Sequence, residues 1–78
     1  MRLTFFGRLR ETIGAGELDR SLPANVADTE SLRAWIGVQY ADLLDDKVRI
    51  AVDDVLATGP VSIEGASEVA FLPPVSGG

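Results

Sequence analysis

The sequence of 78 residues contains no cysteine and no histidine. Their absence excludes disulfide frameworks, thiol nucleophiles, Ser–His and Cys–His pairs, and zinc sites of the usual kind. No loop has the carboxylate spacing of an EF-hand, so we expect no metal site. The aspartate pairs at positions 45–46 and 53–54 more simply mark turns, where Asp bonds its own backbone. We therefore expect no catalysis by this chain unaided.

Positive charge is also scarce, because seven Lys and Arg face twelve Asp and Glu, for a net charge of −5. Nucleic acids and anionic membranes attract basic surfaces, so neither is an expected partner. No apolar run approaches the length of a membrane span, and a strand pattern follows Met1 directly, without the architecture of a signal peptide. Together with the missing cysteines, these absences predict a cytoplasmic protein.

The residues that are present describe one small α+β domain over residues 1–72. Hydrophobic residues make up 46% of the chain, which argues against disorder. Alternation predicts strands over residues 2–7, 17–22, 48–53, 55–57 and 68–72, with a helical turn at 8–13. An apolar stripe predicts the main helix over residues 29–40, with Asp28 as its N-cap. We expect a mixed sheet of four to five strands on this helix, with the first and last strands side by side at its centre.

The most informative segment is the predicted tail over residues 73–78. Two prolines make its base extended and stiff, and two glycines at its end can enter a channel too narrow for other residues. A frayed terminus is the alternative for any chain end. The hydrophobic strand that feeds directly into the tail favours a carboxylate delivered into another protein's active site. The tail consists of Pro73, Pro74, Val75, Ser76, Gly77 and Gly78.

Strand alternation also predicts an apolar patch at the base of the tail. Phe6 falls on the polar face of the first strand, Leu72 falls on the outer face of the last strand, and Leu56 follows a strand whose inward positions are already filled. If the two terminal strands are neighbours, these three side chains form a candidate partner-binding surface. The alternative is that single exposed apolar residues are ordinary and have no role.

Over its whole length the chain resembles the small, sulfur-carrying subunits of molybdopterin synthase, which are ubiquitin-like β-grasp proteins. The resemblance rests on residues 5–11 with Gly14, on residues 49–53, and above all on residues 68–78, a highly specific block. It implies that Gly78 is adenylated by an enzyme related to ubiquitin activators, which uses ATP, and is then converted to a thiocarboxylate. This chain itself is expected to bind no cofactor.

The resemblance further implies a non-catalytic, sulfur-donating subunit. The large, catalytic subunit of the synthase takes up the tail and directs the sulfur onto cyclic pyranopterin monophosphate, and the apolar contacts to it lie on the face that carries Phe6, Leu56 and Leu72. Two alternatives remain open. One is a sulfur carrier of the thiamine pathway, and the other is a ubiquitin-like modifier, or a β-grasp module that only binds a partner.

Overall fold

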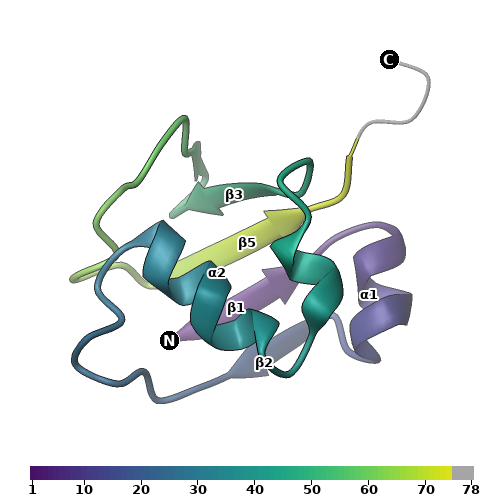
Figure 1. Ribbon diagram of the computed structural model, residues 1–78, viewed down its shortest axis with the longest axis horizontal. Helices are drawn as coiled ribbons and strands as arrows, with labels where there is room; N and C mark the ends of the chain where they lie inside the picture. Colours follow the sequence, from purple (N-terminus) through teal and green to yellow (C-terminus); the bar gives the residue numbers. More distant parts are fainter. Residues whose placement is uncertain (75–78) are drawn as a thin grey trace.

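The computed structural model describes residues 1–74, which form one sheet with helices packed against it (Figure 1). The elements follow one another along the chain as β1 (Arg2–Phe5), α1 (Arg8–Ile13), β2 (Glu17–Asp19), α2 (Thr29–Gly37), the 3-10 helix η1 (Ala41–Leu44), β3 (Arg49–Val52), β4 (Val55–Leu56) and β5 (Glu68–Leu72).

The sheet has five strands in the order β2-β1-β5-β3-β4. β1 and β5 pair in parallel, with Phe5 opposite Phe71, whereas the other three pairings are antiparallel. The last strand therefore occupies the centre of the sheet, beside the first strand, and the two run in the same direction (Figure 1). The predicted α+β class, the mixed sheet and the central pair of terminal strands are confirmed.

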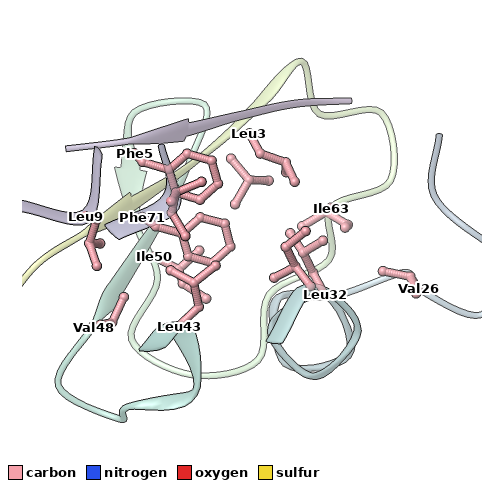
Figure 2. Packing of buried hydrophobic residues seen from close by; sticks show 13 residues of the cluster. Leu3, Phe5, Leu9, Val26, Leu32, Leu43, Val48, Ile50, Ile63 and Phe71 are labelled. Carbon is pink, nitrogen blue, oxygen red and sulfur yellow. The ribbon is translucent and has the colours of Figure 1, made fainter. Parts of the chain in front are cut away.

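The core lies between α2, η1 and one face of the sheet. Phe5 and Phe71 are almost completely buried, and their rings stack with centroids 5.5 Å apart and planes 14° apart. Figure 2 shows these rings between the sheet and the aliphatic residues of the helices. Removing this apolar surface from water is the main stabilising term for so small a domain. The buried cluster consists of Leu3, Phe5, Leu9, Ile13, Val26, Leu32, Ile36, Leu43, Val48, Ile50, Ile63, Val69 and Phe71.

Asp28 is the N-cap of α2, as predicted. Its Oδ1 accepts a hydrogen bond from the Ser31 backbone N–H at 2.8 Å, and Ser31 Oγ accepts one from the Asp28 backbone N–H at 3.2 Å. This reciprocal pair satisfies two amides that a helix start leaves free. The bonds from the Ser31 backbone and hydroxyl favour the ionised carboxylate and lower the pKa of Asp28.

Five predicted elements were too long. The first strand, predicted over residues 2–7, ends at Phe5, because Gly7, with a φ of 56°, starts the turn into α1, and the strands predicted over residues 48–53 and 55–57 cover only Arg49–Val52 and Val55–Leu56. The helix ends at Gly37 and not at residue 40, because Leu44 of η1 folds back over this glycine. A Cβ on Gly37 would lie 2.3 Å from Leu44 Cδ2, so a side chain at position 37 would have to displace the Leu44 side chain from this place. The strand predicted over residues 17–22 ends at Asp19, because Asp19 pairs with Arg2, the first residue of β1. Beyond this pair, the Arg20 backbone N–H donates one hydrogen bond to the Met1 carbonyl.

The predicted turns are confirmed by the backbone. Asp53 and Asp54 both have positive φ, 46° and 71°, and connect β3 to β4. The Asp45 carboxylate accepts a hydrogen bond from the Lys47 backbone N–H at 2.9 Å, the Asx arrangement expected of a turn. Gly14 ends α1 with a φ of 88°. Residues 61–63 form no regular strand, and Ser62 makes a single β-bridge with Asp28.

Candidate functional site: the tail base and the outer face of the sheet

The base of the predicted tail continues directly from the central strand. Proline has no N–H to donate to the ladder, so β5 ends at Leu72, and Pro73 and Pro74 follow it, both half-buried. The remaining tail residues, Val75, Ser76, Gly77 and Gly78, lie outside the described residues. The base of the tail is thus anchored by the central strand that it follows directly.

Phe6 and Leu72 lie side by side on the outer face of the sheet, the face opposite α2. The pairing of β1 with β5 continues one step beyond Phe5, because the Phe6 N–H donates to the Phe71 carbonyl at 3.1 Å. Phe6 therefore stands next to Leu72, and its side chain is 45% exposed. A large aromatic ring half in solvent is the unusual feature here, since the ring of the preceding residue, Phe5, is almost completely buried.

Leu56 belongs to the same face but stands further away. It pairs with Ala51, which pairs in turn with Ala70 on β5. The two alanine methyls form a low apolar floor between Leu56 on one side and Phe6 with Leu72 on the other. Phe6 and Leu56 are three strand spacings apart and offset by two residues along the strands, which together separate them by roughly 16 Å. We call these five residues, Phe6, Ala51, Leu56, Ala70 and Leu72, the docking face.

Polar residues border the docking face at both ends. At the start of β5, Glu68 accepts hydrogen bonds from Arg2 Nε at 3.1 Å and from Thr4 Oγ1 at 2.9 Å. At the tail end, Arg49 stands opposite Leu72 in the register and is exposed. An apolar centre with a polar rim is the usual anatomy of a protein–protein interface.

Two residues that support this site were missed by the reading of the sequence. Asp53 accepts hydrogen bonds from the backbone N–H groups of Ser67, at 3.0 Å, and Glu68, at 2.9 Å, and so holds the start of β5. Arg33 donates to the carbonyls of residues 43, 45 and 48 at 2.8 to 3.0 Å, which ties α2 to the segment before β3. Neither role has a signal in the sequence, because the partners are distant along the chain.

Hollows flank the tail base on both sides. One, of about 370 Å³, lies between α1 and η1 and is lined by Arg8, Asp42 and Pro74 among others. The other, of about 430 Å³, is lined by residues 46, 47 and 49 with Pro73 and Pro74.

In residues 1–74, no three acidic side chains come close enough together to hold a metal ion. No helix in this part of the chain is long and apolar enough to cross a membrane.

The sequence pattern that defines the ThiS family matches residues 3–78, nearly the whole chain including the Gly-Gly end. The chain belongs to the ThiS family. It is also 32% identical to the "Molybdopterin synthase sulfur carrier subunit" of Escherichia coli (strain K12), and the match covers 100% of this chain and 99% of that protein. The resemblance to the small subunits of molybdopterin synthase is thereby confirmed.

A solved structure has the same fold. It is the "Putative molybdopterin converting factor, subunit 1" from Pyrococcus furiosus, with a TM-score of 0.69 and 23% identity over 95% of each chain. At this identity the likeness concerns the fold alone. The predicted ubiquitin-like β-grasp architecture is confirmed.

Proposed function

We propose that this ThiS family protein is a sulfur carrier in molybdenum cofactor biosynthesis, with the sulfur held at its C-terminal carboxylate. The observation that carries the proposal is the match to the Escherichia coli sulfur carrier subunit, which runs over the entire chain and so includes the Gly-Gly end. The sequence offers no cysteine, so the terminus is the position where a chain of this composition can hold sulfur.

The chemistry begins with activation of Gly78. A carboxylate is a poor electrophile, since its charge is delocalised. In an adenylating enzyme related to ubiquitin activators, a Gly78 carboxylate oxygen attacks the α-phosphate of ATP, and pyrophosphate leaves. A sulfur donor then supplies sulfur as HS⁻, which attacks the acyl carbon and expels AMP; loss of the proton leaves a thiocarboxylate. ATP is bound by that enzyme, and the carrier supplies only the acyl group.

The sulfur is then passed to cyclic pyranopterin monophosphate within the large subunit of molybdopterin synthase. Tail capture uses backbone hydrogen bonds and recognition of the terminal group, and a closed channel keeps the reactive acyl carbon from water. The docking face supports this partnership, because Phe6, Leu56 and Leu72 expose apolar surface beside the tail base. We place these steps in the cytoplasm, as the composition predicts.

A second candidate follows from the family itself. The ThiS family also covers carriers of the thiamine pathway, in which the same terminal thiocarboxylate would serve a thiazole-forming enzyme. A third possibility, attachment of the chain to lysines as a ubiquitin-like modifier, would use the same adenylate but end in an amide bond. All three share the first step and differ in the acceptor.

The test is the intact mass of the protein after incubation with ATP, the adenylating enzyme and a sulfur source. Replacement of one oxygen by one sulfur is expected, and larger conjugates would instead support the modifier. The thiocarboxylated protein is then offered in parallel to the synthase large subunit with its pterin substrate and to a thiazole-forming enzyme. Transfer only in the second reaction would move the assignment to the thiamine pathway.

A further inference from the structure

The direction in which the tail leaves the domain is set by a contact at Gly7. Gly7 lies in the turn between β1 and α1, and its backbone, with φ 56° and ψ −138°, occupies a region open almost only to glycine. The backbone N–H of the preceding residue, Phe6, donates a hydrogen bond to the Phe71 carbonyl. This turn therefore lies beside the residues that follow β5. Gly7 therefore faces the base of the tail.

The ring of Pro73 rests on the bare α-carbon of Gly7. A Cβ built on Gly7 would lie 2.9 Å from Pro73 Cγ and 3.6 Å from Pro73 Cδ. Real Cβ atoms do not approach carbon this closely, so any side chain at position 7 would push the ring away by several tenths of an ångström. A proline ring is closed onto its own backbone nitrogen, so beyond the small displacement of Cγ that a change of ring pucker allows, moving the ring means moving the backbone of residue 73.

The consequence for the tail follows from its two prolines. The ring of each proline holds its φ near −65°, so Pro73 and Pro74 form a stiff unit that transmits a change of direction to the residues after it. Binding into a narrow acceptor site is sensitive to such misplacement, since a shift of about 1 Å can lower a rate by about a hundredfold.

We propose that Gly7 is a positioning residue for the C-terminal tail, because its missing side chain provides the seat on which Pro73 sets the direction of exit. The proposal rests on the proposed function for its kinetic consequence, but the seat itself is a property of the free protein. Glycine at position 7 thus serves both the turn into α1 and the delivery of the terminal carboxylate.

The test is Gly7→Ala, compared with two controls that also place alanine at a positive φ. Gly14, with a ψ of 9°, lies in the left-handed helical region, which costs alanine less than the Gly7 conformation, so part of any loss of stability in Gly7→Ala belongs to the backbone, and the double variant described below separates that part from the contact with Pro73. Gly14 and Gly65 also have positive φ, 88° and 77°, and a Cβ on either would meet no atom within 4 Å. Gly14→Ala and Gly65→Ala therefore report the cost of alanine at positive φ away from the tail. A further variant, Gly7→Ala with Pro73→Ala, removes the ring atoms nearest to the new methyl group.

The first measurement needs no partner. In the NMR spectrum of the wild-type protein, contacts between the Gly7 α-protons and the Pro73 γ-protons are expected, and Gly14→Ala and Gly65→Ala should keep them. Their absence from the wild-type protein would overturn the proposal even if the chain proves to be a sulfur carrier. Their presence, with no activation of Gly78 by any adenylating enzyme, would overturn the proposed function and leave the seat intact.

The second measurement is the rate of adenylate formation at a temperature where every variant is folded. We expect Gly7→Ala to lower kcat/KM about tenfold, mainly through kcat, because the folded domain still binds the adenylating enzyme but its redirected tail presents the carboxylate poorly. The two control variants should match the wild type, and Pro73→Ala should restore most of the rate lost in Gly7→Ala. A rate for Gly7→Ala equal to those of the controls, or no recovery in the double variant, would show that Gly7 serves the turn alone.

Discussion

Phe5 and Phe6 are adjacent in sequence but stand on opposite faces of the sheet, and this contrast provides the sharpest prediction. Phe5 is 1% exposed and stacks on Phe71, whereas Phe6 is 45% exposed. Truncating each to alanine removes the same atoms from two different environments. We therefore expect Phe5→Ala to damage the fold and Phe6→Ala to damage binding.

The magnitudes follow from burial. Phe5→Ala leaves a cavity in the core, which typically costs about 3 to 5 kcal/mol. A domain of this size is stable by only about 4 to 12 kcal/mol, so much of its stability would be lost. Burying a phenylalanine fully is worth about 1.5 to 3 kcal/mol, and Phe6 is only about half covered, so Phe6→Ala should cost about 1 kcal/mol.

Binding should show the opposite order. An aromatic anchor at the centre of an interface contributes about 2 kcal/mol or more, so Phe6→Ala should weaken binding to the synthase large subunit about thirtyfold. Phe6→Arg should weaken it further, since the interface would bury an unpaired charge. Denaturant unfolding gives the free energies of unfolding, and titration calorimetry at a temperature where both variants are folded gives the affinities.

Two results would refute this reasoning. If Phe6→Ala lost as much stability as Phe5→Ala, the register of β1 would be shifted by one residue, because a single step exchanges the two faces. If Phe6→Ala kept both stability and affinity, the docking face would lie elsewhere on the domain.

Four further predictions concern the terminus, the helix cap, one turn and the acceptor. One residue appended after Gly78 should abolish adenylation while the melting temperature stays unchanged; continued adenylation would contradict the terminal mechanism. The lowered pKa of Asp28 means that its charged cap stabilises the fold above the unfolded pKa and ceases to do so as the pH falls through the folded one. The stability difference between wild type and Asp28→Ala, followed by thermal unfolding, should therefore shrink on acidification below about pH 4. Asp54→Gly should raise the free energy of unfolding by about 1 kcal/mol, because Asp54 has a φ of 71° that glycine adopts without strain; no gain in denaturant unfolding would contradict this. Thiocarboxylated protein alone should leave cyclic pyranopterin monophosphate unchanged by product analysis, and adding the large subunit should consume about two thiocarboxylates per dithiolene formed.

Local features of this protein could be predicted from its sequence. Asp28 caps its helix and Gly14 ends α1 because capping and left-handed turns depend on the backbone sterics of a few neighbouring residues. The strand over residues 68–72 has the predicted bounds, since alternation begins after a glycine turn and a proline must end it. The chemistry of the terminus stays a prediction, which rests on the absence of cysteine and on the Gly-Gly end of the sequence.

Other features were decided only by the tertiary structure. Nothing near Gly37 predicts that Leu44 folds over it and shortens the helix, and nothing near Gly7 predicts that Pro73 rests on it. The alanine floor of the docking face and the distance of Leu56 from Phe6 depend on which strands become neighbours. The contact of Gly7 with Pro73 and the docking face join residues that are far apart in the sequence, and both form only when the first and last strands pair. The contact of Gly37 with Leu44 is more local, but it too depends on how η1 packs. Their geometry is set by packing, whereas local conformational preference sets the turns and caps.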